Sequence, residues 1–339
     1  MIFIRADANE HIGSGHVMRC ISIAEALTRR GETIRFITSD HKSDKLISQY
    51  GFGSIALETR WDDMDFEINK LISLIDDLTP IMMIVDSYRV TKSYFSTLSK
   101  RIKIAYVDDI NKSIWDIAYL INYNIDSETH DYSGYNKFET KLLLSPYYAP
   151  LRQQFRSLPK RVIHENVNDI LISTGGADTE RLTERIITDI IQERKEITFH
   201  IIIGLMNPYL EEIQRIKPDN VVLHINEQHM SSVMRKCDIA ISAAGSTLYE
   251  LCACGTPTIS FVLADNQINA AKEFDSKNII VNVGDCRNNT SFIDDLKKRL
   301  MLLIDDCNKR SILSERMQDL IDGFGADRIA DELVESSDI

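Results

Sequence analysis

The chain has 339 residues, with 39 Lys and Arg against 51 Asp and Glu, so its formal charge is −12 when the histidines are neutral. Its composition, 44% hydrophobic and 27% charged, is that of a globular protein, and its length exceeds the size at which a single core usually stops growing. The acidic balance, without a long basic run, excludes nucleic acid or an anionic membrane surface as the main partner. We therefore expect two domains, and any phosphate-bearing ligand must be held by local features.

The apolar segments of the sequence are too short to cross a membrane. None approaches the ~20 residues that a bilayer crossing needs, and the first residues lack the basic and apolar regions of a secretory signal. The six cysteines lie mostly in apolar segments, and their spacing matches no zinc site. The sequence predicts a cytoplasmic protein with reduced cysteines and without stable membrane association, bound metal or cofactor.

Short runs rich in Ile, Val and Phe alternate with segments of helical period, which is typical of βα units and parallel sheets. Strands are expected at 2–5, 34–38, 81–86, 104–108, 119–123 and 142–144, and again at 170–173, 199–203, 221–225, 239–242, 258–262 and 279–283. The polar, proline-containing stretch 156–166 predicts a linker. The pattern indicates two Rossmann-like, doubly wound α/β domains, 1–157 and 166–325, facing a cleft where the carboxyl ends of both sheets bind ligands.

The first glycine turn follows the first expected strand. Gly13 and Gly15 frame a tight turn, and the next helix shows one apolar face. His16 then lies in the first turn of that helix, where the positive end of the dipole disfavours an imidazolium and lowers the histidine pKa. A neutral base facing the cleft is expected, and a capping histidine or one that supports other site residues is the alternative.

Two further glycine turns open the second half. Gly175 and Gly176 follow the strand at 170–173 and allow a ligand to approach the backbone, although a tight turn alone explains them equally well. Gly245 ends the strand at 239–242, and Ser246 and Thr247 then offer hydroxyl and N–H groups at a helix N-terminus. This second turn predicts an anion site.

Glu250 comes one helical turn after Ser246, where its carboxylate can accept hydrogen bonds from the vicinal hydroxyls of a sugar while a phosphate occupies the helix N-terminus. The alternative is a favourable first-turn acid, worth ~0.3–1 kcal/mol to the helix. The polar segment 265–267 after the next strand, including Asn266, favours the ligand interpretation.

Other acids follow strands of the first half. Asp86 and Tyr88 come after one strand, and Asp108 and Asp109 after another, where carboxylates orient a sugar or a base, or cap a helix. The acids at 63–65 match the DxD pattern of metal-dependent glycosyltransferases. They precede a helical run, so solvated acids at a helix start are the preferred interpretation.

Taken together, these motifs resemble a known family, the UDP-2,4-diacetamido-2,4,6-trideoxy-β-L-altropyranose hydrolases of pseudaminic acid biosynthesis. The resemblance spans most of the chain and lies in segments 5–7, 13–19, 85–88, 107–109, 122–124, 148–152, 174–178 and 242–250. One departure is Ser145, where a glycine is expected. That family is similar to GT-B glycosyltransferases, with two Rossmann-like domains and the nucleotide on the second. The resemblance also implies that helix 326–339 packs back on the first domain.

By the same resemblance, His16 is the catalytic general base, Glu250 binds ribose, Ser246 and Thr247 bind the diphosphate, and Ile225 lines the uracil pocket. The implied substrate-binding residues also include Arg5, Asp7, Gly13, Gly15, Asp86, Tyr88, Asp108, Asn122, Tyr148, Arg152, Gly175, Gly176, Gly245 and Asn266.

The resulting hypothesis is hydrolysis of a UDP-linked 2,4-diacetamido-2,4,6-trideoxyhexose, with water attacking C1 under inversion and His16 as base. The partners are the UDP-sugar and water, and no cofactor is implied. The alternatives are a GT-B glycosyltransferase with a UDP-sugar donor, a non-catalytic UDP-sugar binding protein and a sugar-nucleotide epimerase of GT-B shape.

Overall fold

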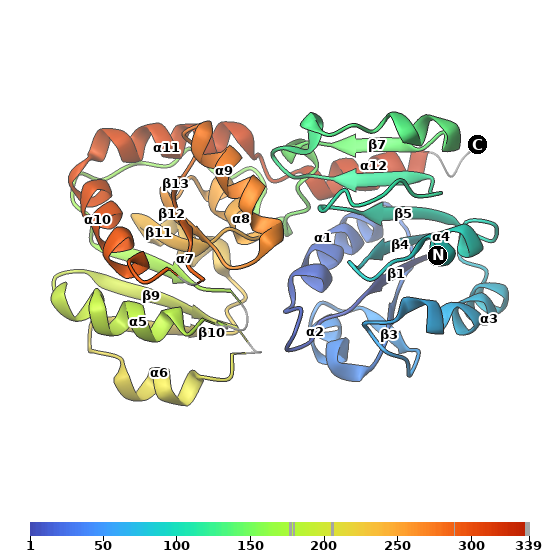
Figure 1. The fold of residues 1–339 in the computed structure, drawn as a ribbon, viewed down its shortest axis with the longest axis horizontal. Coiled ribbons are helices and arrows are strands. Elements are labelled where there is room, and N and C mark those ends of the chain that lie inside the picture. Colours follow the sequence, from blue (N-terminus) through green and yellow to red (C-terminus); the bar gives the residue numbers. More distant parts are fainter. Residues whose placement is uncertain (176–177, 179, 205–206, 288, 336–339) are drawn as a thin grey trace. The chain divides into compact units, whose positions relative to one another are not determined.

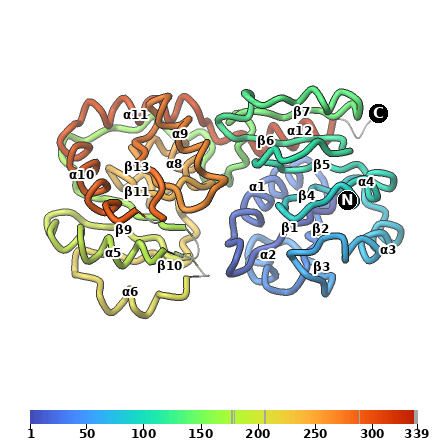
Figure 2. The backbone as a smooth tube through the Cα atoms, in the orientation of Figure 1, coloured from blue at the N-terminus to red at the C-terminus, as the bar shows by residue number. Residues whose placement is uncertain are grey.

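The computed structural model describes residues 1–175, 178, 180–204, 207–287 and 289–335. It divides into two compact units, one formed by Met1–Arg152 with the chain from Phe324 onward, and the other by Gln153–Gly323. Figure 2 traces this path and shows the red helix α12 (Gly325–Glu335) lying with the blue and green unit. Each unit has its own apolar core.

The first unit is built on a seven-stranded sheet with the order β3-β2-β1-β4-β5-β6-β7, in which every pair of neighbours is parallel. Its elements, labelled in Figure 1, are β1 (Ile2–Ala6), α1 (Gly15–Arg29), β2 (Ile34–Thr38), α2 (Asp44–Gln49), β3 (Gly53–Ala56), α3 (Ile68–Leu78), β4 (Met82–Asp86), α4 (Lys92–Leu98), β5 (Lys103–Val107), β6 (Tyr119–Asn122) and β7 (Lys141–Leu144). Strand order reverses between β1 and β4. In open α/β sheets, ligands bind at the carboxyl ends of the strands at such a point.

The second unit repeats this plan on a six-stranded parallel sheet with the order β10-β9-β8-β11-β12-β13. Its strands are β8 (Asp169–Ser173), β9 (Thr198–Ile203), β10 (Val221–Ile225), β11 (Ile239–Ala243), β12 (Thr258–Val262) and β13 (Val281–Asp285). Its helices are α5 (Leu182–Asp189), α6 (Leu210–Ile216), α7 (Met230–Lys236), α8 (Thr247–Cys254), α9 (Ile268–Ser276), α10 (Phe292–Asp305) and α11 (Cys307–Leu320). Here the order reverses between β8 and β11. The predicted fold class, two doubly wound α/β units, is confirmed.

Helix α1 follows β1 and carries the first glycine turn. Its predicted apolar face is fully buried, and this burial fixes the helix against the sheet. Gly13 takes a φ of 69°, a left-handed conformation that glycine adopts readily, and Gly15 begins the helix. The face consists of Val17, Ile21, Ala24 and Leu27.

Helix α12 returns the chain to the first unit. It buries Ile329 and Leu333, and Arg29 of α1 donates a 2.9 Å hydrogen bond to Asp327. A Cβ on Gly325 would lie 2.1 Å from the carbonyl oxygen of Ala149, so only glycine permits this approach. The predicted helix at 326–339 is a helix as far as Glu335, and positions 336–339 lie outside the described residues.

One strand was not predicted, and another begins two residues later than predicted. The strand β3 was not predicted, because its four residues, Gly-Ser-Ile-Ala, are only half-buried at the sheet edge. The strand expected at 279–283 is β13, Val281–Asp285. Ile279 instead completes the end of α9: its N–H donates to Phe274 O at 3.0 Å, after Asn278 takes a φ of 52°.

Candidate functional site

A pocket of about 350 Å³ lies in the first unit, within the range of small-molecule sites. Asp7 follows β1, Asp86 ends β4 and Ile110 follows β5, so the pocket occupies the carboxyl edge of the sheet where strand order reverses. His16 also lines it. The remaining lining residues are Ile12, Trp61, Ser87, Tyr88, Arg89 and Lys112.

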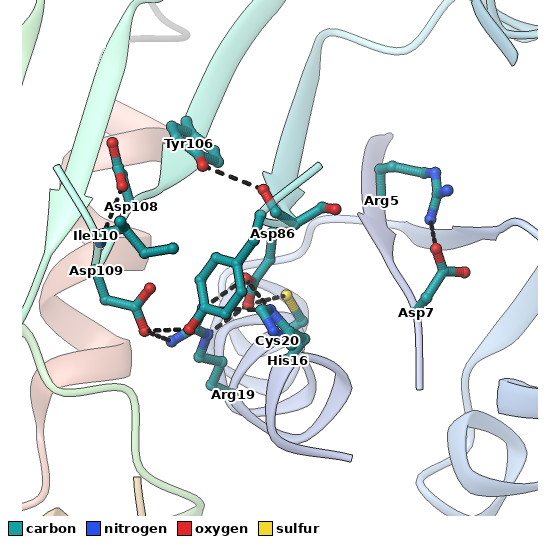
Figure 3. A network of polar contacts seen from close by, with 12 residues as sticks. Arg5, Asp7, His16, Arg19, Cys20, Asp86, Tyr106, Asp108, Asp109 and Ile110 are labelled. Atoms are coloured by element: carbon teal, nitrogen blue, oxygen red, sulfur yellow. Dashed lines mark hydrogen bonds and ion pairs between the residues drawn. The ribbon is translucent and has the colours of Figure 1, made fainter. Parts of the chain in front are cut away.

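His16 is fixed by a carboxylate. Its Nδ1 lies 2.6 Å from Asp86 Oδ1, and the two side chains are 8% and 1% exposed (Figure 3). An ionised carboxylate only accepts hydrogen bonds, so the proton of a neutral imidazole lies on Nδ1. The pairing therefore leaves Nε2 as the nitrogen with a lone pair, which is the requirement for a general base.

Arg19 holds the other side of Asp86. It lies one helical turn after His16, and its Nε and Nη2 donate to Asp86 Oδ2 and Oδ1 at 2.5 and 2.6 Å. Burial raises the pKa of the Asp86 carboxyl, but the charge and hydrogen bonds of Arg19 and the hydrogen bond with His16 outweigh it and hold that pKa well below its usual range. Asp86 is therefore ionised throughout the neutral range.

Tyr88 packs against the histidine. Its ring meets that of His16 edge-on, with centroids 4.6 Å apart, and its hydroxyl donates to Asp109 Oδ2 at 2.9 Å. Burial and the Asp109 charge raise the pKa of the Tyr88 phenol far above its ordinary value. Tyr88 is thus a neutral side chain that fixes the imidazole ring laterally.

Arg5, predicted to bind substrate, is buried behind the pocket residue Asp7. Its guanidinium is fully buried and donates twice to Glu67 at 2.7 Å. It also donates once to Asp7 Oδ2 at 2.6 Å (Figure 3). Asp7 also accepts the Ser39 N–H at 2.7 Å and lines the pocket. The hydrogen bonds of the guanidinium thus go to two carboxylates, and Asp7 connects Arg5 with the pocket.

Asp108, also predicted to bind substrate, is hydrogen-bonded within the loop after β5. It accepts hydrogen bonds from the indole N–H of Trp115 and from the backbone N–H groups of Ile110 and Asn111, and it is 1% exposed. Burial raises its pKa. The carboxylate shapes the loop after β5 and does not line the pocket.

Three further predicted residues are likewise absent from the pocket lining. Asn122 is buried and donates to the Tyr132 hydroxyl at 3.1 Å. Tyr148 donates to Glu332 of α12 at 3.3 Å, and Arg152 is buried at the end of the first unit. The departure noted at Ser145 has a structural meaning, since its φ of 84° is one that favours glycine.

The candidate residues of the second unit lie at one edge of its sheet. Gly175 follows β8 with a φ of 86°, Ile225 ends β10, and Gly245 and Ser246 stand between β11 and α8. Asn266 lies in the short 3₁₀ turn Asp265–Gln267 after β12. The remaining candidates, Thr247 and Glu250, lie in the first turn of α8, and Gly176 lies outside the described residues.

Arg19 and Trp61 were not predicted to belong to the site, and the contact between Asp109 and Arg19 was not foreseen. Arg19 bonds to Asp86, Asp109 bonds to Arg19 at 2.7 Å, and Trp61 lines the pocket with Arg89 lying over its ring. The three-residue spacing of His16 and Arg19 on one helix face was the available signal.

Neither a metal cluster nor a membrane-crossing helix is found in the part of the chain that the structure describes. Within the described ranges, no group of three or more His, Cys, Asp and Glu side chains is arranged to hold a metal ion. Among the helices of the described residues, none combines the length and apolar character that a bilayer crossing requires.

Comparison with known proteins places this geometry in context. The sequence profile of the glycosyltransferase family 28 C-terminal domain matches residues 168–320, within the second unit. Among solved structures, MurG of Acinetobacter baumannii has a TM-score of 0.68 at 13% identity, covering 98% of this chain and 99% of MurG. The architecture is therefore GT-B-like.

Two relatives found by sequence are longer than this chain. The chain is 25% identical over 282 residues to an uncharacterised protein of Methanocaldococcus jannaschii. It is also 25% identical over 272 residues to the pseudaminic acid cytidylyltransferase and UDP-2,4-diacetamido-2,4,6-trideoxy-β-L-altropyranose hydrolase of Helicobacter pylori. Each match covers 79% of this chain, but 56% and 45% of the two relatives, so the chain spans about half their length.

Proposed function

We propose that the chain hydrolyses a UDP-linked 2,4-diacetamido-2,4,6-trideoxyhexose to UDP and the free sugar in pseudaminic acid biosynthesis. The sequence motifs and the Helicobacter pylori relative, whose name includes this hydrolase activity, support the substrate. The observation that carries the reaction type is His16, which lines a pocket with Nδ1 bonded to the buried, ionised Asp86.

The reaction needs one base and one water molecule. Nε2 of neutral His16 accepts a proton from water while the water oxygen attacks C1 of the sugar. The bond from C1 to the UDP oxygen breaks, its electron pair leaves with UDP, and the configuration at C1 inverts through an oxocarbenium-like transition state. The imidazolium then returns its proton to solvent, so the products are UDP, free sugar and one proton.

Asp86 serves this step in two ways. It keeps the single N–H proton of the neutral imidazole on Nδ1, so that the lone pair of Nε2 faces the water. Its negative charge also stabilises the imidazolium that forms. Because Arg19 keeps Asp86 ionised at neutral pH, His16 Nδ1 faces a partner that only accepts hydrogen bonds.

The leaving group requires no acid. The backbone N–H groups at the start of α8, with the hydroxyls of Ser246 and Thr247, bind the diphosphate, and Glu250 accepts hydrogen bonds from ribose hydroxyls. UDP departs as a stable anion whose developing charge these donors stabilise. A glycosidase acting on a neutral sugar would need a second carboxyl group to protonate the leaving oxygen.

His16→Ala tests the assignment of the base. Turnover of the UDP-sugar should fall by about 10²- to 10⁴-fold while UDP affinity is retained, because only the proton acceptor is lost. His41→Ala, at an exposed histidine bonded to Asp44, is the matched control and should retain turnover. Near-wild-type turnover of His16→Ala would remove His16 from the mechanism.

The match of the second unit to the glycosyltransferase family 28 domain favours a second candidate, glycosyl transfer from a UDP-sugar. An acceptor hydroxyl would then replace water, and His16 would take its proton. UDP release in a buffer that contains no acceptor supports hydrolysis, whereas release only after addition of an envelope acceptor supports transfer.

A further inference from the structure

Arg19 is a buried cation that the hydrolytic step does not itself use. Its side chain is 7% exposed, and its guanidinium makes four hydrogen bonds. Two go to Asp86, one goes from Nη1 to Asp109 at 2.7 Å, and one goes from Nη1 to the Tyr123 hydroxyl at 2.8 Å. A planar fork held on both sides has a single orientation available to it.

Arg19 and His16 bind the same oxygen of Asp86. Asp86 Oδ1 accepts both from Arg19 Nη2 at 2.6 Å and from His16 Nδ1 at 2.6 Å. Rotation of the carboxylate would break both bonds of the Arg19 fork, so Arg19 fixes the direction in which Asp86 holds the imidazole. Arg19 and His16 are three residues apart on α1, so the base and the group that fixes its partner belong to one rigid element.

Arg19 also lies near the base itself. Its Nη2 is 3.4 Å from His16 Nδ1, close enough for its charge to oppose a second positive charge on the ring. The network thus balances two effects, since Asp86 favours the imidazolium and Arg19 opposes it.

We propose that Arg19, clamped by Asp109 and Tyr123, is the positioning residue that fixes the orientation and tautomer of His16 through Asp86. This proposal rests on the proposed function for its kinetic consequences, but not for its structural ones. It predicts that the geometry of the Arg19 fork, as well as its charge, is required for turnover.

Two variants separate geometry from charge. Arg19→Lys keeps the charge but loses the two-pronged bond, so kcat should fall by up to about 10²-fold while KM changes little, because Arg19 does not line the pocket. Arg19→Gln removes the charge as well. Arg29→Lys, on the same helix and paired with Asp327, is the matched control and should keep wild-type kcat.

The pH profile distinguishes a positioning role from a merely structural one. In Arg19→Gln the acid limb of kcat should move to higher pH, because loss of a neighbouring cation makes protonation of the base easier, whereas in Arg19→Lys it should stay in place. The other charged or titratable groups near His16 are unchanged in both variants. They include Asp7, Cys20, Asp86, Tyr88, Arg89, Asp109, Lys112 and Tyr123.

Nitrogen-15 NMR of the imidazole gives a readout that does not need turnover. With eight histidines in the chain, the His16 signals are assigned by their loss in His16→Gln. We expect one Nδ1–H tautomer in the wild type and a mixture in Arg19→Lys. If Arg19→Lys fails to fold, Tyr123→Phe, which removes only one acceptor of Arg19, should show the same change to a smaller extent.

The outcomes separate the two proposals. A mixed tautomer in Arg19→Lys, in a protein that does not hydrolyse the UDP-sugar, would support Arg19 as the positioning residue and overturn the hydrolase assignment. An unchanged single tautomer with wild-type kcat in Arg19→Lys would overturn the role of Arg19, whatever the reaction is.

Discussion

Replacement of Asp86 by asparagine tests whether the carboxylate directs the base. The new side-chain amide presents an N–H group to His16 Nδ1, which favours the tautomer with the imidazole proton on Nε2. In that tautomer Nε2 cannot accept a proton from water. Loss of a correctly placed base costs about 10²- to 10⁴-fold in rate, and a wrong tautomer belongs at the upper end. Binding of UDP should be unchanged, because Asp86 lies in the first unit and the nucleotide candidates lie in the second.

The structure also sets the stability cost. Removing one partner of a buried ion pair costs about 3–5 kcal/mol when the other charge is left uncompensated. In Asp86→Asn, Arg19 keeps Asp109 at 2.7 Å and the Tyr123 hydroxyl at 2.8 Å, so we expect a loss near the lower figure. Urea denaturation measures this loss.

The pH dependence of stability has a definite sign. The native pKa of Asp86 is held well below its usual range of about 3.9, so its ionisation favours the folded state above about pH 4, and this contribution is lost as the pH falls toward the native pKa. In Asp86→Asn the free energy of unfolding should therefore fall less steeply between neutral pH and about pH 3 than in the wild type.

Asp109→Asn is the matched comparison. It also removes a carboxylate from Arg19, at 2.7 Å, but Asp109 has no bond to His16. Both variants should lose similar stability, whereas Asp86→Asn should lose far more kcat. Equal kcat losses in the two variants would refute the direct role of Asp86 in orienting the base.

Two further predictions concern the nucleotide candidates of the second unit and the packing of α12 on the first unit. Glu250→Gln should weaken UDP binding about tenfold or more by calorimetry, since a hydrogen bond to a charged group contributes about 1.5–3 kcal/mol. Glu273→Gln, at an acid paired with Lys277, should not, and equal affinities would remove Glu250 from the site. Gly325→Ala should destabilise the first unit by about 1–3 kcal/mol in urea, because its Cβ would lie 2.1 Å from a backbone oxygen. The control Gly245→Ala, whose Cβ would meet no atom closer than 3.8 Å, should unfold near the wild type, and parity of the two variants would contradict the packing of α12.

The strands were predictable where burial on both faces produced continuous apolar runs. β2, β10 and β12 have their predicted bounds, and β1 and β4 differ by one residue. The edge strand β3 escaped prediction because its four half-buried residues begin with a glycine and carry no alternation strong enough to detect.

Part of the pocket was predictable, because the carboxyl ends of parallel strands lie at the same edge of the sheet. The rule that ligands bind where strand order reverses brings His16 and the end of β4 together, and the structure places His16, Asp86 and Tyr88 at one pocket. The partners of Arg5 and Arg19 were not predictable. Glu67 is 62 positions from Arg5, and Asp109 is 90 positions from Arg19, so neither pairing leaves a local pattern.

Isotopic labelling shows whether the oxygen of water attacks C1 of the sugar, as the proposed hydrolysis requires. The purified chain is incubated with UDP-2,4-diacetamido-2,4,6-trideoxy-altrose in ¹⁸O water, with a chelator and without any acceptor, and followed by phosphorus and carbon NMR. Hydrolysis at C1 should release UDP with the label on C1 of the free sugar and none on the β-phosphate. Label on the phosphate would contradict the mechanism, and an unchanged substrate would contradict hydrolysis itself.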